Sequence, residues 1–321
     1  MPKTKIKPSK HYKLLGIKIR KVSIKYYFMK FFYMVKEFLF LSLYTKFPIS
    51  YSRKTFFYYT SNLNFGDILN FEIISKILKI NIVKASIEKA DYMFIGSLAQ
   101  TLISDKAKYS NPIKVIGAGF IEEQTQEVEN YIRPLSILCV RGKLTKERFE
   151  KNLNTSLENV VLADPGILAP LLLDESKIIK KYKVGIVPHF SDRFSPLLKE
   201  LSNNIPGSKI INIQNCPIQV TQEIAECEII SASAMHALIV ASALSIPNQW
   251  IKFSDLYGGE YKFKDFYSAF NIENPTAIDL RTSEITTQII ENIKKSYSFP
   301  MKMLKQKQLQ IMNLLEKEFY Q

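Results

Sequence analysis

The chain has 321 residues, 46% of them hydrophobic and 12% aromatic, which is enough to bury the cores of two ordinary domains and excludes a disordered or fibrous protein. Its three cysteines are odd in number and far apart, and with the three histidines they form no zinc-type spacing, so we expect free buried thiols and no metal site. The net charge of +14 is concentrated in residues 1–58, where fourteen Lys and Arg accompany one acid, Glu37, so the rest of the chain is close to neutral.

Residues 1–53 predict a basic, aromatic-rich arm that is largely helical. Its lysines interrupt the roughly 20 apolar residues that a transmembrane helix needs, and the apolar run 38–44 lacks a following small-residue cleavage site. Three interpretations remain: a helix on an anionic membrane surface, a nucleic-acid arm, or a solvated extension. We favour the membrane surface, because each lysine adds roughly 1 kcal/mol there while aromatic residues bury in the interface. We therefore expect a cytoplasmic protein at the inner face of the cytoplasmic membrane, with no nucleic-acid partner.

Strand-like and helix-like runs alternate from residue 54 to residue 176. This alternation predicts a parallel sheet covered by helices on both faces. The expected helices are residues 68–78 and 143–149, and the expected strands are residues 55–60, 82–85, 92–95, 113–116, 137–140 and 160–162.

The same pattern starts again over residues 177–300, after a junction near 171–181. Helices are expected near 196–201, 235–244 and 283–293, and strands at 184–187, 209–213, 228–231, 249–253 and 277–280. Residues 301–321 predict a closing helix, since apolar residues recur there at near-helical spacing with Gln308 as the one polar break. The fold class is therefore α/β, with two Rossmann-like units in a GT-B-like arrangement, the N-terminal arm and the C-terminal helix.

Ligands of open α/β sheets bind beyond the carboxyl ends of the strands, so we look for polar residues at those positions. Asn64, Gly66 and Asp67 follow the first strand, where they predict either substrate binding or helix capping alone. Glycine at a strand end lets backbone N–H groups face an anion, although each such glycine on its own more often marks a tight turn. The candidates of this second kind are Gly96 with Ser97, and Gly117 with Gly119.

Charged and titratable residues follow other predicted strands. Arg141 comes directly after an apolar run, where its guanidinium could grip a carboxylate or phosphate, or form a structural ion pair with Asp164. His189 and His236 both fall at strand ends of the second unit. A functional role is favoured for them over structural packing, because two histidines at equivalent positions face one cleft.

Six segments in order resemble the motifs of polysaccharide pyruvyl transferases: residues 64–70, 140–145, 164–166, 186–189, 231–247 and 261–267. The resemblance covers roughly residues 55–270. It implies an enzyme that transfers an enolpyruvyl unit from phosphoenolpyruvate to a sugar of a surface glycan, as in capsule or exopolysaccharide synthesis, and forms a pyruvate ketal. It also implies a glycan acceptor that is lipid-linked, and no cofactor.

The resemblance implies catalytic roles for His236 and His189, and substrate binding by residues that include Ser233 and Lys262. Histidine suits the acid and base steps of this chemistry. In one respect the chain departs from the family pattern: many members carry an arginine two residues before the second histidine, where this chain has Ala234. The anion-binding role then falls to Arg141, Arg193 or Lys262.

Two other classes of protein remain open from the sequence. A GT-B-type glycosyltransferase that uses a nucleotide sugar would share the architecture, and a non-catalytic protein on the same fold is suggested by Ala234. Donor preference and turnover separate these classes from a pyruvyl transferase.

Overall fold

The computed structural model describes residues 11–14, 17–20, 54–59, 63–283 and 285–320. The chain divides into two compact units, Met1–Pro48 and Ile49–Gln321. In the first unit, β1 (His11–Leu14) pairs antiparallel with β2 (Ile17–Arg20), with His11 opposite Arg20. The predicted helical arm is wrong for these two segments, because the alternation of Ile17, Lys18, Ile19 and Arg20 is typical of a strand. The rest of the predicted arm lies outside the described residues.

Within the part of the chain that the structure describes, no helix is both long enough and apolar enough to cross a membrane.

The second unit begins with a six-stranded, wholly parallel sheet in the order β4-β3-β5-β6-β7-β8. Every strand expected before residue 170 is confirmed: β3 (Lys54–Phe57), β4 (Ile82–Lys84), β5 (Tyr92–Met93), β6 (Ile113–Ile116), β7 (Leu135–Val140) and β8 (Val161–Leu162). Its helices are α2 (Phe65–Glu72), which continues as a π-helical turn over Ile73–Ile77, and α3 (Lys143–Leu153). Short 3-10 segments follow at Ala99–Leu102, Pro165–Leu172 and Glu175–Lys177.

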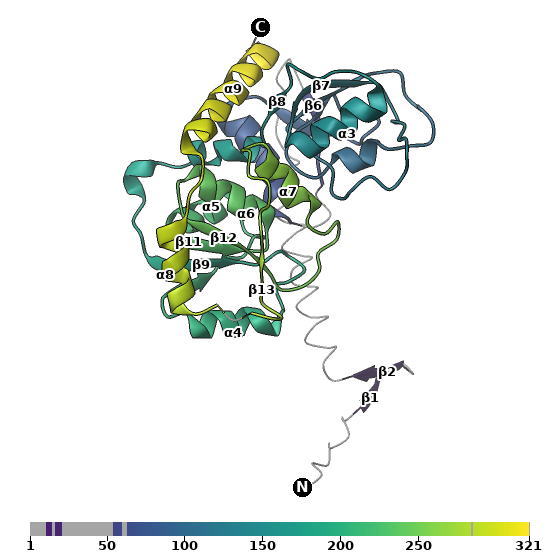
Figure 1. Cartoon of the computed structure of the whole chain (residues 1–321). Helices are drawn as coiled ribbons and strands as arrows, with labels where there is room; N and C mark the ends of the chain where they lie inside the picture. Colours follow the sequence, from purple (N-terminus) through teal and green to yellow (C-terminus); the bar gives the residue numbers. More distant parts are fainter. Residues whose placement is uncertain (1–10, 15–16, 21–53, 60–62, 284, 321) are drawn as a thin grey trace. The chain divides into compact units, whose positions relative to one another are not determined.

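A second parallel sheet follows, with five strands in the order β10-β9-β11-β12-β13. The expected strands are again confirmed: β9 (Tyr182–Val187), β10 (Ser208–Ile210), β11 (Cys227–Ala232), β12 (Asn248–Lys252) and β13 (Ile278–Asp279). The two sheets, which Figure 1 shows with their helices, are consistent with the predicted Rossmann-like, GT-B-like fold. The predicted boundaries at 53/54, 176/177 and 300/301 stay predictions.

Five helices accompany the second sheet: α4 (Pro196–Asn204), α5 (Pro217–Ala225), α6 (Met235–Ala243), α7 (Tyr261–Ser268) and α8 (Thr287–Ser296). Three of these were expected, whereas α5 and α7 were not. Helix α8 begins four residues later than expected, because the Thr286 hydroxyl accepts a hydrogen bond from the Ile289 amide and so caps the helix there.

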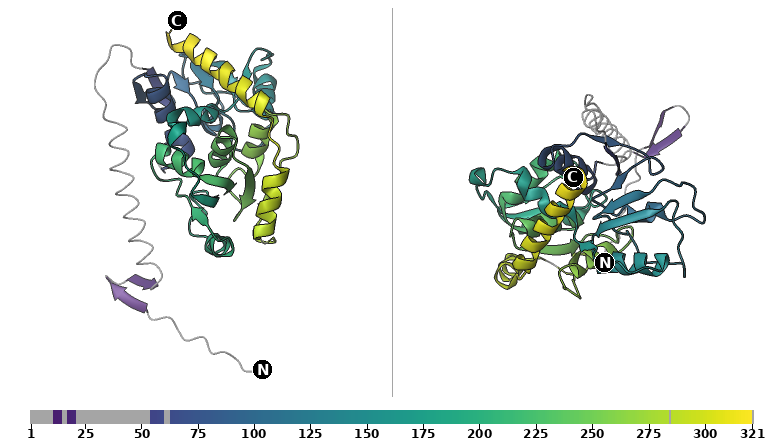
Figure 2. Two further views of the ribbon diagram at one scale, coloured as in Figure 1. Left: turned by 90° about the vertical axis from the view of Figure 1, so that its left-hand side faces the viewer. Right: turned by 90° about the horizontal axis from the view of Figure 1, so that it is seen from above.

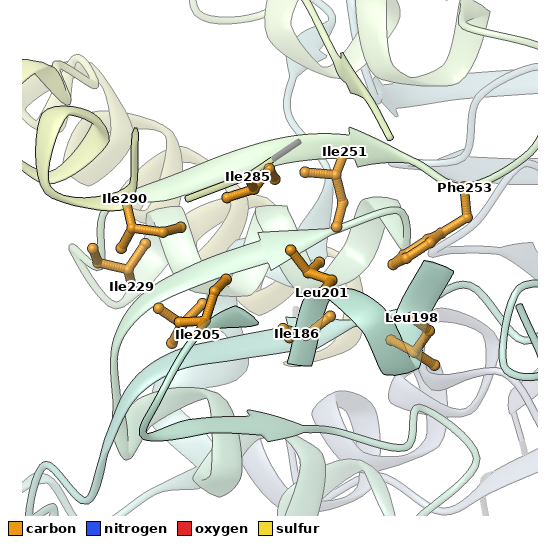
Figure 3. Packing of buried hydrophobic residues seen from close by; sticks show 10 residues of the cluster. Ile186, Leu198, Leu201, Ile205, Ile229, Ile251, Phe253, Ile285 and Ile290 are labelled. Atoms are coloured by element: carbon orange, nitrogen blue, oxygen red, sulfur yellow. The ribbon is translucent and has the colours of Figure 1, made fainter. Parts of the chain in front are cut away.

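One face of the second sheet packs on α4 and α8. Figure 3 shows this core, in which isoleucines of β9, β11 and β12 meet Leu198 and Leu201 of α4 and Ile290 of α8. Helix α6 packs on β11 and β12 and also on the 3-10 segment Pro165–Leu172. All its residues from Met235 to Ser242 are buried, as expected for a helix that is apolar all round. The N-terminus of α6 is thereby held against the first half of this unit.

The expected closing helix is confirmed as α9 (Met301–Tyr320), which follows α8 in both views of Figure 2. Leu304, Ile311 and Leu315 form its buried stripe. The polar break at Gln308 has a structural cause, because its amide donates to the Ile167 carbonyl oxygen over 2.9 Å. Near its end, Glu318 accepts a hydrogen bond from the Tyr92 hydroxyl, so α9 ties the end of the chain to the first sheet.

Candidate active site

A cavity of about 330 Å³ opens at the carboxyl ends of the strands of both sheets. Its lining residues follow β3, β5 and β6 of the first sheet and β9, β11 and β12 of the second. This is the position at which ligands bind to open α/β sheets. The lining residues are Tyr59, Asn64, Phe65, Asp67, Ser97, Ile121, His189, Phe190, Ala234, Met235, His236, Tyr257 and Lys262.

His236 is the second residue of α6 and only 8% exposed. Its Nε2 lies 3.5 Å from Oδ2 of Asp164, a fully buried carboxylate, and neither atom has a hydrogen-bond partner among the described residues. The other oxygen of Asp164, Oδ1, accepts from the Gly166 amide over 2.8 Å, which fixes the carboxylate. With Nε2 turned toward Asp164, the Nδ1 edge of the ring lies against Gly66, and His236 is one of the residues that line the cavity.

Gly66 is required by this histidine. It is the second residue of α2 and is not among the residues that line the cavity. A Cβ atom there would overlap Nδ1, Cε1 and Cγ of His236. Glycine therefore lets the imidazole ring lie directly on the backbone of α2.

Gly66→Ala should displace the His236 ring. In an ordinary helix this change is favourable by about 1 kcal/mol, but here the overlap should cost about 1–3 kcal/mol of unfolding free energy. Denaturant unfolding measures the cost, and the double variant with His236→Ala is the control. Without the imidazole, Gly66→Ala should no longer destabilise, so an equal cost in both backgrounds would contradict the contact.

Lys262 extends from α7 into the cavity and is 8% exposed. No carboxylate of the described residues lies within ion-pair distance of its Nζ atom, which sits 5.6 Å from the centre of the Phe263 ring. Burial, together with the positive charge of Arg141, lowers the pKa of Lys262 to about 8, against the opposing effect of Asp67 and Asp192. Of the three cations suggested by the sequence, this one lines the cavity.

Asp67 is the carboxylate of the cavity. Burial raises its pKa to about 6, although the charges of His236 and Lys262 and a hydrogen bond from Asn64 act in the opposite direction. Asn64 occupies the N-cap position of α2, but its side chain makes no cap hydrogen bond and donates to Asp67 Oδ2 over 3.0 Å. Capping by the Asn64 side chain is therefore wrong. Both residues line the cavity, and substrate binding by them stays a prediction.

His189 reaches the cavity from the loop after β9. Burial and the charge of Lys262 lower its pKa to about 3, so the ring is neutral at neutral pH. Its backbone N–H donates to Ser233 Oγ over 2.9 Å, and Ser233 in turn donates to Asp192 Oδ2 over 2.7 Å. Ser233, a predicted substrate ligand, lies behind the lining and holds the His189 turn.

Arg141 is fully buried and lies outside the cavity lining. Its Nε donates to Asp265 Oδ2 over 2.8 Å, so its ion-pair partner is Asp265 rather than Asp164. Its Nη1 donates to the Ser97 hydroxyl, which does line the cavity. The side chain thus contributes positive potential to the cavity from behind Ser97.

Asp265 also holds the N-terminus of α3. Its Oδ1 accepts from the Thr145 amide over 2.9 Å and its Oδ2 from the Thr145 hydroxyl over 2.7 Å. A Cβ atom at Gly142 would overlap the Asp265 carbonyl oxygen, so this glycine permits the close approach of α7 to α3. Lys262 and Asp265 belong to one helix, so these contacts also position Lys262.

Asp265→Asn should cost about 3–5 kcal/mol of unfolding free energy, because it leaves the buried Arg141 without its counter-charge. Denaturant unfolding measures the loss. Asp255→Asn is the matched control, since Asp255 pairs with Arg281 at the surface, where an ion pair contributes little. Equal stability of the two variants would contradict the importance of the buried pair.

Two of the predicted anion-binding glycines, Gly117 and Gly119, serve packing instead. The Gly117 amide donates to the Cys139 carbonyl oxygen and the Gly119 amide to that of Gly96, so the prediction that these two amides face an anion is wrong. Gly117 has φ +91° and a Cβ there would overlap Pro165, while one at Gly119 would overlap the Arg141 guanidinium. Gly96 has φ +124° and directs the chain to Ser97, the member of this group that lines the cavity.

Several residues of the site were not predicted. Asp164 was considered as a partner of Arg141 and as part of the motif 164–166, but not as a partner of His236. No motif or spacing in the sequence marks Tyr59, Tyr257 or Phe190 as residues of the site. Arg193, a candidate cation, lies outside the lining, with its Nη1 donating to the Phe190 carbonyl oxygen and its guanidinium 4.6 Å from the Phe194 ring centre.

The chain is similar to a known protein family. The family model described as polysaccharide pyruvyl transferase matches residues 22–252. An uncharacterized protein of Acanthamoeba polyphaga mimivirus is 29% identical over 227 residues, which cover 67% of this chain and 74% of that protein.

Two solved structures show distant similarity. One is a functionally uncharacterized protein from Klebsiella pneumoniae, with a TM-score of 0.41 and 14% identity over 77% of this chain and 98% of that one. The other is the wall teichoic acid polymerase TagF, with a TM-score of 0.38 and 11% identity over 82% of this chain and 83% of that one.

Proposed function

Because this chain belongs to the polysaccharide pyruvyl transferase family, we propose that it transfers the enolpyruvyl unit of phosphoenolpyruvate to a sugar of a surface glycan and forms a pyruvate ketal. The observation that carries the proposal is the cavity in which His236, backed by Asp164, lies with Lys262 and Asp67. Its volume falls within the range of about 300–1,000 Å³ that is usual for small-molecule sites.

Donor binding requires positive charge, since phosphoenolpyruvate carries a carboxylate and a phosphate. Lys262 supplies a cation inside the cavity, and Arg141 adds positive potential from behind Ser97. Because Lys262 is only 8% exposed, water screens its interaction with the donor less than it would at the surface.

The reaction moves two protons, from the two sugar hydroxyl groups to the methylene carbon of the donor and to the departing phosphate, and these transfers need positioned groups. A proton adds to the methylene carbon of the donor, and C2 becomes electrophilic. A sugar hydroxyl then bonds to C2 and loses its proton, the bond from C2 to the phosphate oxygen breaks, and phosphate leaves. A second hydroxyl of the same sugar attacks C2, loses its proton and closes the ketal. Of the two protons that the hydroxyl groups lose, one is equivalent to the proton gained by the new methyl group and the other leaves with phosphate.

Three groups of the cavity divide this work in our proposal. Asp164, whose Oδ2 lies 3.5 Å from His236 Nε2, orients the imidazole ring, and the ring exchanges a proton with the reactants. Asp67, with its pKa raised to about 6, is a second group able to exchange a proton near neutral pH. His189 stays neutral and orients substrate by hydrogen bonding rather than acting as an imidazolium.

Phosphoenolpyruvate should raise the thermal midpoint of the protein, and nucleotide sugars should not. A ligand that binds only the folded state at 100 times its Kd adds about 2.7 kcal/mol of stability. Phosphate release and the mass gain of a synthetic glycan acceptor then report turnover. Stabilisation by nucleotide sugars alone would instead support a GT-B-type glycosyltransferase.

Two further parts of the proposed function are the kind of acceptor and the location of the protein in the cell. We propose a lipid-linked acceptor and a position at the inner face of the cytoplasmic membrane, reached through the basic arm. The +13 balance of residues 1–58 supports the second point, and co-sedimentation with anionic vesicles at low and high salt tests it. The reaction as written needs no cofactor besides the donor.

A further inference from the structure

We propose that Tyr59 and Tyr257, together with Glu122, form the subsite for the acceptor sugar at the mouth of the cavity. The inference rests on the proposed function and adds to it a location for the acceptor. Both tyrosines line the cavity that holds His236 and Lys262. They come from different halves of the second unit, Tyr59 after β3 and Tyr257 after β12.

Exposure separates an inner and an outer part of this cavity. His236 and Lys262 are each 8% exposed, whereas Tyr59 is 42% and Tyr257 is 71% exposed. A small anionic donor held by Lys262 would occupy the inner part. The acceptor is part of a longer glycan that must extend into solvent, so its sugar has to enter past the two exposed rings.

The chemistry of the two tyrosines fits a sugar. A pyranose ring presents a face of C–H bonds that packs on the electron-rich face of an aromatic ring, while hydroxyl groups surround its edge. Tyrosine provides a large, rigid contact area at a low cost in conformational entropy. Glu122 Oε1 lies 3.4 Å from the Tyr257 hydroxyl, so a carboxylate acceptor for sugar hydroxyls stands beside the ring.

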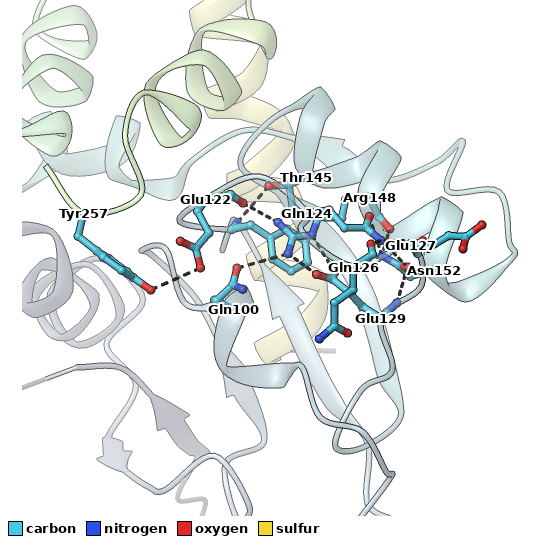
Figure 4. A network of polar contacts seen from close by, with 11 residues as sticks. Gln100, Glu122, Gln124, Gln126, Glu127, Glu129, Thr145, Arg148, Asn152 and Tyr257 are labelled. Atoms are coloured by element: carbon cyan, nitrogen blue, oxygen red, sulfur yellow. Dashed lines mark hydrogen bonds and ion pairs between the residues drawn. The ribbon is translucent and has the colours of Figure 1, made fainter. Parts of the chain in front are cut away.

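The mouth of the cavity is held in place by contacts of its own. Gly258, next to Tyr257, has φ +75°, and a Cβ atom there would overlap the Ile121 carbonyl oxygen, so the loop after β12 lies directly on the loop after β6. Figure 4 shows Glu122 between Tyr257 and Arg148. Arg148 donates to the Glu122 carbonyl oxygen and pairs with Glu129 over 2.6 Å. The subsite is thus preorganised before a sugar arrives.

The experiment compares Tyr257→Ala, Tyr257→Phe and the wild-type protein. The probes are the methyl pyranosides of glucose, galactose and mannose, tested by phosphate release with phosphoenolpyruvate and, for binding alone, by saturation-transfer NMR. Tyr257→Ala should raise the acceptor KM or weaken the NMR effect about tenfold, because a ring contact is lost. Tyr257→Phe keeps the ring and should retain most of the affinity. Phe194→Ala is the matched control, an exposed aromatic residue outside the cavity.

The thermal shift caused by phosphoenolpyruvate keeps the two proposals apart. It should be the same in wild type and Tyr257→Ala. If phosphoenolpyruvate stabilises the protein but Tyr257→Ala binds and uses the glycosides as well as the wild type does, or if wild type binds none of them, the acceptor subsite is wrong and the donor proposal stands. If phosphoenolpyruvate has no effect on wild type while the glycosides bind through Tyr257, the subsite stands and the proposed reaction is wrong.

Discussion

His236→Ala should lower turnover about 10²–10⁴-fold while the affinity for phosphoenolpyruvate changes by only a few-fold, because a positioned proton-transfer group acts mainly on the transition state. Steady-state phosphate release gives the turnover, and donor titration of the thermal midpoint gives the affinity. The pairing with Asp164 supports this expectation, since the buried carboxylate orients the ring.

His189→Ala is the comparison variant for this experiment. Because the pKa of His189 is lowered to about 3, its ring cannot act as an imidazolium near neutral pH. Its loss should therefore raise the apparent KM more than it lowers turnover. A His236→Ala protein that is folded and nearly fully active would contradict the catalytic assignment, and loss of stability together with activity would indicate a structural role.

The alternating sheets could be predicted because their signals are local. A run such as Ile113, Lys114, Val115 and Ile116 reports a buried strand from its own residues, and the stripe of Leu304, Ile311 and Leu315 reports a helix. Helices α5 and α7 were missed for different reasons. Pro217 occupies the first turn of α5, where proline is well tolerated, but in a sequence a proline indicates that a helix ends. In α7, charged residues lie between the apolar residues Phe263 and Phe266. One of them, Asp265, is buried because it pairs with Arg141.

The pairs that build the site could not be predicted, because each joins residues far apart in the chain. Asp164 meets His236, and Arg141 meets Asp265 across 124 positions. The sequence placed Arg141 correctly after a strand, but its partner depends on α7, which was not predicted. Gly66 was a candidate for substrate binding, and the structure shows the His236 ring packed against it. The position of a site residue at the end of a strand was thus predictable, whereas the residue that it contacts was not.

Lys262→Met should weaken phosphoenolpyruvate binding about 10–100-fold, because a hydrogen bond to a charged group contributes roughly 1.5–3 kcal/mol. The substitution should not lower the stability of the folded protein. The pKa of Lys262 is lowered to about 8 in the folded protein, which means that burial disfavours the ammonium form, so removing it should leave the thermal midpoint equal or higher. Donor titration and thermal unfolding of the same variant measure the two effects.

The pH dependence of donor binding provides the sharper test of Lys262. The ammonium form predominates below its pKa of about 8 and is lost above it, so the affinity for phosphoenolpyruvate should fall about tenfold between about pH 7 and about pH 9. Lys262→Arg is the matched control, because a guanidinium stays protonated throughout this range and its affinity should vary little with pH. His236 and Asp67 also face the donor, but the pKa of Asp67, raised to about 6, lies below this window, so its charge is nearly constant there. An equal fall in affinity for wild type and Lys262→Arg would assign the titration to another group and remove Lys262 from the proposed donor site.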